Sequence, residues 1–307
     1  MTTIDDLIIR YGIVGHRRFY EREKVTFLKG IAEEFKKMGY PVEIKVSKKG
    51  QFRSYNLYVG NAKEAGTVVT TYYDTPAKNF SARPYRVLSK ANKGFSYYLS
   101  TFLPMILIVA FGLSLIKMVV MPHWSDDRLT GLNVLFVLLL LFLFSLTLSY
   151  RKGMGNRKNM VRNTSSVLVL IEAAKEINPL EDVAFALTDF GCVNYLGEEM
   201  VKRHIGASWK NKQFIMLDVV GASGNLVMFA SSSFKQTVIH ARKMFQDLRL
   251  IAKDLDKAKS KQRKIYPNSL IIASGSLIDD ELVVATKDHA LDKERIKQVA
   301  KLLGSIV

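Results

Sequence analysis

Two long runs of apolar residues interrupt a chain in which apolar and polar positions otherwise alternate with the periods of helices and strands. The runs cover Phe95–Val120 and Leu132–Leu148, and the polar stretch Met121–Gly131 joins them. Each run is long enough to cross a hydrocarbon core of about 30 Å as a helix that rises about 1.5 Å per residue. The first has a single charged residue, Lys117, near its end, and the second has none. The pattern predicts a transmembrane hairpin with spans at about 95–120 and 131–150.

Basic residues flank the two runs, whereas the stretch between them has one arginine, Arg128, offset by Asp126 and Asp127. Under the positive-inside rule, both ends of the hairpin then face the cytoplasm. The first ten residues lack the pattern of a secretory signal. We therefore expect a multi-pass protein of the cell membrane, of bacterial type, with two spans and with both termini in the cytoplasm. The flanking basic residues are Arg83, Arg86, Lys90, Lys93, Arg151, Lys152, Arg157 and Lys158.

Outside these runs, segments with a helical period alternate with short segments typical of strands. Helices are expected at Tyr20–Met38, Thr164–Glu176, Leu196–His204, Phe234–Lys257 and Asp292–Leu303. Strands are expected at Val42–Val46, Ser54–Val59, Thr67–Tyr73, Asp182–Thr188, Phe214–Val220, Asn225–Ala230, Ser269–Ser274 and Glu281–Ala285. Such alternation predicts an α/β fold, a three-layer sandwich with a mostly parallel mixed sheet. One cytoplasmic domain would consist of residues 1–90 and 151–307, and the hairpin at 95–150 would interrupt it.

The chain of 307 residues has a formal net charge of +17, which makes nucleic acid a partner to consider. Many of the basic residues, however, lie beside the two apolar runs, where anionic lipid headgroups would account for them. A further basic cluster at residues 257–264 has no aromatic residue among its lysines, unlike typical nucleic-acid modules. We therefore expect a lipid bilayer as a partner and no nucleic acid. The single cysteine, Cys192, excludes an intramolecular disulfide.

Five short segments at predicted strand ends and helix starts carry a recognisable order. They are Thr70–Thr75, Arg162–Val167, Gly191–Gly197, Leu217–Gly221 and Thr286–Asp288. In this order they resemble the M28-type zinc aminopeptidase family, whose motifs are His-x-Asp-Thr, Asp-Asn-x-Ser-Gly-Val, Glu-Glu-x-Gly-Leu-x-Gly, Leu-Asp-Met-x-Gly and a late His-Thr-x-x-Asp. The resemblance covers nearly the whole chain outside the hairpin. It implies a zinc-aminopeptidase-like fold with the hairpin inserted at the rim of the active site.

The chain departs from the family at the positions that bind zinc and activate water there. Tyr72 stands at the place of the first histidine ligand, and Arg162 at that of the bridging aspartate. Gly191 stands at the place of the general base, and Cys192 at that of a glutamate ligand. The late histidine falls near residues 284–285, although His289 lies close enough to be considered.

Two carboxylates of the family pattern remain, Asp218 as a ligand and Asp74 as an orienting group. Hydrolysis needs a metal-bound water and a base that accepts its proton, and an arginine keeps its own proton. We therefore expect a degenerate, catalytically inactive member without zinc, other cofactors or catalytic residues. Two placements of Arg162 stay open: its guanidinium lies between the two aspartates in place of the metals, or it extends to lipid headgroups.

These observations lead to a functional expectation and two alternatives. The leading interpretation is an inactive M28-like domain that acts as a binding or scaffold subunit of a membrane complex, associated with a transporter or a secretion system, with another integral membrane protein as its partner. The first alternative is a membrane-bound metallopeptidase that uses unconventional ligands among Asp74, Cys192, Asp218 and His289. The second is a basic peripheral module that binds anionic lipid or nucleic acid.

Overall fold

A computed structural model of the chain shows two compact units. It describes residues 2–50, 52–77, 84–89, 95–121, 130–150, 155–157, 159–179, 182–257, 261–284 and 291–307. The first unit consists of Met1–Pro76, Arg83–Lys90 and Arg157–Val307, and the second of Ala77–Ala82 and Ala91–Asn156.

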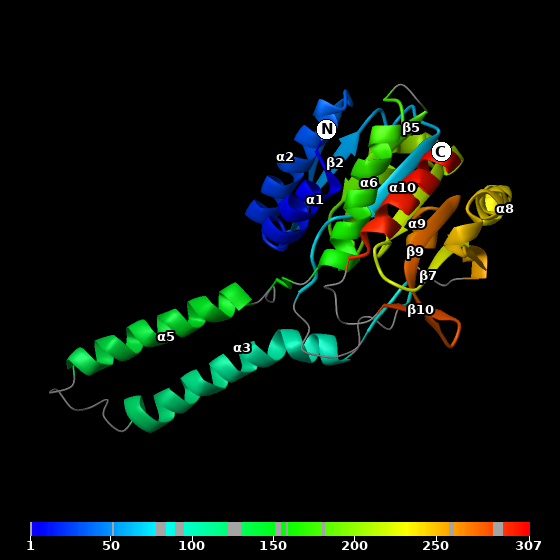
Figure 1. Ribbon diagram of the computed structural model, residues 1–307. Helices are drawn as coiled ribbons and strands as arrows, with labels where there is room; N and C mark the ends of the chain where they lie inside the picture. Colours follow the sequence, from blue (N-terminus) through cyan, green and yellow to red (C-terminus); the bar gives the residue numbers. More distant parts are fainter. Residues whose placement is uncertain are drawn as a thin grey trace. The chain divides into compact units, whose positions relative to one another are not determined.

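A ten-stranded mixed sheet forms the centre of the first unit (Figure 1). The strand order is β1-β2-β5-β3-β6-β9-β10-β4, and β7 and β8 extend the sheet from β9. Parallel pairing joins β5, β3, β6 and β9 at the centre, whereas β1 and β2 on one side and β10 and β4 on the other pair antiparallel. The strands are β1 (Val42–Lys49), β2 (Phe52–Val59), β3 (Thr67–Tyr72), β4 (Tyr85–Arg86), β5 (Val183–Thr188), β6 (Gln213–Asp218), β7 (Asn225–Ala230), β8 (Ile251–Asp254), β9 (Ser269–Ile278) and β10 (Glu281–Val284).

The central strands are apolar on both sides because both faces of the sheet are covered. All six residues of β5 are buried, which is typical of a strand in the parallel centre of a sheet. Successive side chains of a strand point to opposite faces. Accordingly, Val68 and Val69 of β3 belong to two different apolar clusters.

Helices cover the two faces (Figure 1). On one face, α2, α6, α8 and α10 share an apolar cluster with α1, and α6 packs along α10. On the other face, α7 and α9 contribute to a second cluster. The α/β layers predicted from the sequence are therefore present in this unit. The α-helices are α1 (Ile4–Leu7), α2 (Glu21–Lys37), α6 (Ser165–Glu176), α7 (Leu196–Ile205), α8 (Lys235–Met244), α9 (Lys261–Ile265) and α10 (Lys293–Ile306). Two π-helices, η1 (Ile8–Val14) and η5 (Met160–Thr164), and four 3₁₀-helices, η6 (Gly206–Asn211), η7 (Ser232–Phe234), η8 (Gln246–Leu248) and η9 (Leu255–Lys257), are also found in the described part of this unit.

The long helix predicted over Phe234–Lys257 is wrong. Helix α8 ends at Met244, because the backbone of the next residue leaves the helical region, and Arg249 adopts a left-handed conformation with φ of 46°. The chain then forms β8, which pairs in parallel with β7. Leu248 and Leu250 are both buried, so pairing and burial at the sheet override the helical spacing of the apolar residues.

The second unit contains two helices of 21 residues, α3 (Phe95–Leu115) and α5 (Thr130–Tyr150), and α3 continues into η3 (Ile116–Val120). Gly112 brings the two helices together, since a Cβ atom at this position would lie 3.6 Å from Leu143 and 3.8 Å from Leu140. The helices therefore pack against each other through a small residue on one side and leucines on the other.

Among the helices that the structure describes, none combines the length and the apolar content needed to cross a membrane. This finding contradicts the predicted transmembrane hairpin. It also contradicts the predicted location in the cell membrane with two spans and cytoplasmic termini. The apolar runs correctly predict where helices form. Crossing a membrane requires more than forming a helix, because it takes about 20 consecutive apolar residues in the hydrocarbon core. The predicted outer loop at 121–130 lies almost entirely outside the described residues.

Glu198 at the start of α7 is a carboxyl group buried inside the first unit. Its Oε1 accepts a hydrogen bond of 3.0 Å from Thr188 Oγ1, and its Oε2 has no partner among the described residues. Burial raises the pKa of Glu198 to about 8, well above its ordinary value of 4.5. Glu198 is therefore neutral in the folded protein at pH 7.

Titration of Glu198 should make the folded protein less stable as the pH rises. Between pH 4.5 and about 8, the folded state keeps the proton that the unfolded state releases, so the free energy of unfolding falls across this window. Glu198→Gln, which carries no titrating proton, should flatten this dependence and gain stability relative to the wild type as the pH approaches 8. Urea unfolding at pH 5 and pH 8 measures the difference. The exposed Glu64→Gln serves as the control, and an equal slope in both variants would contradict the assignment.

Candidate functional site

The carboxyl ends of β3, β5 and β6 place the residues singled out from the sequence at one edge of the sheet. Tyr72 ends β3 and Asp218 ends β6, and the segment after β5 contains Gly191 and Cys192. Because these strands are parallel, the segments that follow them meet at the same edge. Arg162 comes from η5, immediately before α6.

Asp218 is the centre of a compact polar cluster. Tyr72 donates its hydroxyl hydrogen to Oδ1 of Asp218 over 2.6 Å, and Tyr85 donates to Oδ2 over 2.9 Å. The carboxylate is 1% exposed, so these two bonds replace its contact with water. Burial raises the pKa of Asp218, and the hydrogen bonds from the tyrosines and the charge of Arg162 oppose that rise.

Arg162 supplies the positive charge of this cluster. Its guanidinium carbon lies 4.0 Å from the centre of the Tyr85 ring, which is a cation–π contact. Its charge lowers the pKa of Tyr72 and Tyr85, although burial, the larger effect, leaves both raised well above 10. We refer to Tyr72, Tyr85, Arg162 and Asp218 as the Asp218 cluster. Within this cluster, Arg162 contacts the ring of Tyr85, whereas Asp74 is bonded by other groups.

Backbone groups hold Asp74. Its Oδ1 accepts a hydrogen bond of 2.8 Å from the N–H of Gly191, and its Oδ2 accepts one of 3.3 Å from the N–H of Cys192. The thiol of Cys192 in turn donates to the backbone oxygen of Asp74 over 3.2 Å. Burial raises the pKa of Asp74 to about 6. These contacts fix the loop after β5 onto the loop after β3.

The thiol of Cys192 is poorly suited to nucleophilic chemistry. Burial raises its pKa far above the ordinary value, so it stays protonated at neutral pH. Asn163 also donates from Nδ2 to the sulfur over 3.4 Å and to the backbone oxygen of Asp74 over 2.6 Å. Cys192 therefore works here as a partly buried packing and hydrogen-bonding group, as the sequence favours for a lone cysteine.

Gly191 is required by the side chain of Tyr72. A Cβ atom at Gly191 would lie 2.2 Å from both Cβ and Cγ of Tyr72, which no side chain tolerates. The aromatic ring therefore fills the space beside the loop after β5. This is the position at which the resemblance to M28-type aminopeptidases places the general base.

Zinc does not fit the described residues of this edge. In the described ranges, no three His, Cys, Asp or Glu side chains gather in a way that could hold a metal ion. Both oxygens of Asp218 are engaged by tyrosine hydroxyls, and the charge of Arg162 repels a cation. The segment Thr286–Asp288 and His289 lie outside the described residues.

Sequence reasoning missed two members of this site. Tyr85 lies on the two-residue strand β4, where no periodicity marks it, and only its pairing with β10 brings it to Asp218. Asn163 lies next to Arg162 in the segment Arg162–Val167, but its role follows only from the fold. Of the eight flanking basic residues, Arg86 and Arg157 are described, and Arg86 pairs with Glu281. The other six lie outside the described residues, namely Arg83, Lys90, Lys93, Arg151, Lys152 and Lys158.

Loss of the Tyr85 hydroxyl should weaken the Asp218 cluster. Tyr85→Phe removes the 2.9 Å bond to a buried carboxylate, so the free energy of unfolding should fall by about 1 to 3 kcal/mol. Tyr266→Phe is the matched control, because the buried Tyr266 hydroxyl has no hydrogen-bond partner in the described part of the chain. Urea unfolding of both variants gives the comparison. A loss no larger for Tyr85→Phe than for Tyr266→Phe would show that the bond contributes little.

Comparison with solved structures shows the fold. No protein-family model and no curated protein matches the chain. Glutaminyl cyclase from Porphyromonas gingivalis is 12% identical, with a TM-score of 0.57 over 99% of this chain and 97% of that one. A zinc-dependent exopeptidase from Parabacteroides distasonis is 13% identical, with a TM-score of 0.55 over 99% and 97%. A leucine aminopeptidase precursor from Bacteroides thetaiotaomicron is 12% identical, with a TM-score of 0.55 over 99% and 96%.

These neighbours contradict the expectation that the chain is not an enzyme, because they are a glutaminyl cyclase, a zinc-dependent exopeptidase and a leucine aminopeptidase precursor. The expectation of a pseudoenzyme equated the loss of zinc ligands with the loss of all chemistry, and one fold can carry different chemistries at a changed site. At these identities the likeness shows the fold alone. The chain has the α/β fold of these glutaminyl cyclases and exopeptidases.

Proposed function

We propose that the chain is an interaction protein, in which the M28-like unit holds an inserted pair of helices that binds a partner protein. The observation that carries the proposal is the exposure of large apolar side chains along both helices of the second unit. In α3 they are Phe102, Leu103, Ile106, Leu107, Val109, Phe111 and Leu113, and in α5 they are Val134, Leu135, Val137, Leu138, Leu141, Phe142, Phe144 and Leu148.

The exposed apolar side chains are expected to be buried against another molecule. Single exposed apolar residues are common on proteins, but contiguous apolar patches of more than a few hundred Å² mark interaction surfaces. A helix that is apolar on all sides normally lies in apolar surroundings. Burying one exposed leucine fully is worth about 1.5 to 3 kcal/mol, so a cover over both helices would be strongly stabilising.

The polar groups of these helices are already satisfied within the helices. Ser114 donates from Oγ to the backbone oxygen of Ala110 over 2.9 Å, and Thr147 donates to that of Leu143 over 2.9 Å. Hydroxyl groups bonded back to the preceding turn need no water and no polar partner. The described surface of the helices is therefore compatible with apolar helices of a second protein.

The Asp218 cluster supports the scaffold role of the first unit. Tyr85 precedes the insertion in the chain and Arg162 follows it, and both contact one another beside Asp218. The two segments of the first unit that precede and follow the second unit in the sequence are thus held together within the first unit. Rigidity within the first unit is what a scaffold requires.

The partner that binds the exposed apolar surface of α3 and α5 is a protein. The partners expected from the sequence, a lipid bilayer and another integral membrane protein, stay predictions. Of the two, apolar helices of a protein can pack against a surface that has a small residue such as Gly112 between leucines.

Site-specific photo-crosslinking tests this proposal. A photoreactive residue at Leu107 of α3 or at Leu138 of α5 should give an adduct with one protein that differs in mass from the chain itself. The control position, the exposed Lys235 of α8, should give no such adduct. Leu107→Asp should reduce the adduct formed from position 138 by about tenfold, since a charge in an apolar contact is costly. Adducts with lipid alone, with a second copy of the chain, or of equal yield at position 235 would contradict the proposal.

A further inference from the structure

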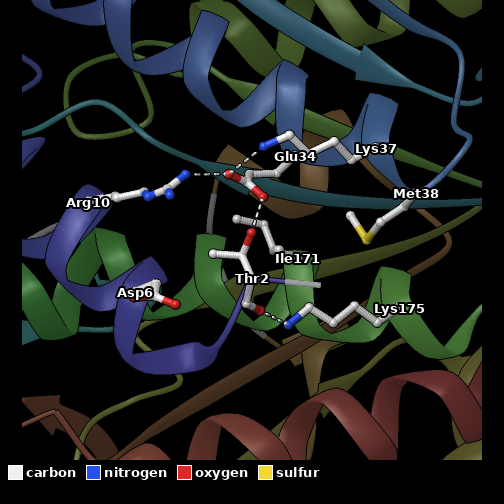
Figure 2. Close-up of a pocket in the computed structure, with 8 residues that line it drawn as sticks. All are labelled: Thr2, Asp6, Arg10, Glu34, Lys37, Met38, Ile171 and Lys175. Carbon is white, nitrogen blue, oxygen red and sulfur yellow. Dashed lines mark hydrogen bonds and ion pairs between the residues drawn. The ribbon is translucent and has the colours of Figure 1, made fainter.

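A cavity lies in the first unit, where the N-terminal segment crosses the end of α2 and the last turns of α6 (Figure 2). It is a cavity of about 400 Å³, and it has no lining residue in common with the Asp218 cluster. Charged side chains surround it: Arg10, Lys37 and Lys175 are cations, and Asp6 and Glu34 are carboxylates. A volume of this size is within the range of pockets that hold small molecules.

The two carboxylates are engaged by groups of the protein itself. Glu34 accepts a hydrogen bond of 2.7 Å from Thr2 Oγ1 at one oxygen and one of 3.1 Å from Arg10 at the other, and Lys37 lies 3.8 Å from the latter (Figure 2). Asp6 accepts bonds from the backbone and side chain of Thr3, which lower its pKa. The contacts of Glu34 therefore join the N-terminal segment to α2.

The three cations keep hydrogen-bond donors beyond these contacts. A guanidinium has five N–H groups and an ammonium has three. In the described part of the chain, Arg10 uses one N–H for Glu34, and Lys175 uses one for the backbone oxygen of Thr2 at 2.9 Å and one for Glu172 at 2.5 Å. The cavity thus has spare N–H donors that a ligand can use.

Burial strengthens an ion pair between Lys175 and a bound anion. Its side chain is 15% exposed, so its ammonium group is poorly hydrated for a lysine. An ion pair formed away from bulk water is less screened than one on the surface. Met38 and Ile171 add an apolar part to the lining, against which carbon atoms of a ligand can pack.

We propose that this cavity binds a compact organic anion, a small carboxylate or phosphate. Its charged group accepts hydrogen bonds from Arg10, Lys37 and Lys175, and its short carbon chain contacts Met38 and Ile171. The site is independent of the proposed partner protein, because none of its residues lies in the second unit. A bound anion would link the N-terminal segment to α2 and α6.

Calorimetric titration of the full chain tests the site, with succinate and glycerol phosphate as probes and sodium chloride of equal ionic strength as the reference. One of the two probes should bind at one site per chain and in preference to chloride. Lys175→Gln should weaken that binding by about tenfold, because a charge-assisted hydrogen bond is lost. Lys235→Gln, on the exposed surface of α8, should leave the affinity unchanged.

A variant that is expected to tighten binding distinguishes an effect on the site from a general effect on folding. Asp6→Asn removes an exposed carboxylate that repels the ligand, so it should tighten binding several-fold. Equal affinity in the wild type, Lys175→Gln and Asp6→Asn would overturn the proposal, and so would binding of the probes no stronger than that of chloride. Preference for succinate or for glycerol phosphate identifies which anion the cavity takes.

Discussion

The buried carboxylate of Asp218 is the constraint on which the architecture of the first unit depends. A carboxylate that loses its water must receive hydrogen bonds and a compensating charge, and here two tyrosines and one arginine provide them. Each donor fixes a different segment: Tyr72 the end of β3, Tyr85 the short strand β4, and Arg162 the turn before α6. The neighbouring loop follows from the same arrangement, because the ring of Tyr72 leaves room only for glycine at position 191.

Much of this arrangement follows from the sequence, because strand ends and helix starts have local signals. Tyr72 ends a β-branched run and Asp218 ends an apolar run, and parallel pairing carries such ends to one edge. Tyr85 could not be found in this way, since a two-residue strand has no period and gains its place through long-range pairing. The misassigned helix after Phe234 has the same cause. Leu248 and Leu250 fit a helical pattern, but both are buried outside a helix, and the residues that follow them pair with β7.

The apolar runs illustrate a different limit of sequence reasoning. Their composition correctly predicts two helices, since leucine and its neighbours have good helical propensity. Whether such a helix crosses a membrane is a separate property, and the described helices do not meet its requirements. A similar separation holds between fold and chemistry. The likeness to zinc enzymes shows the layers of the sandwich, while the residues at the strand ends determine which ligands or reactions the edge can accommodate.

The contact between Tyr85 and Arg162 has a consequence for chain entropy. The guanidinium carbon lies 4.0 Å from the centre of the aromatic ring, although 76 residues separate the two positions in the sequence. The entropic cost of closing a loop grows only with the logarithm of its length. A separation of this length therefore costs the first unit little more than a much shorter one would.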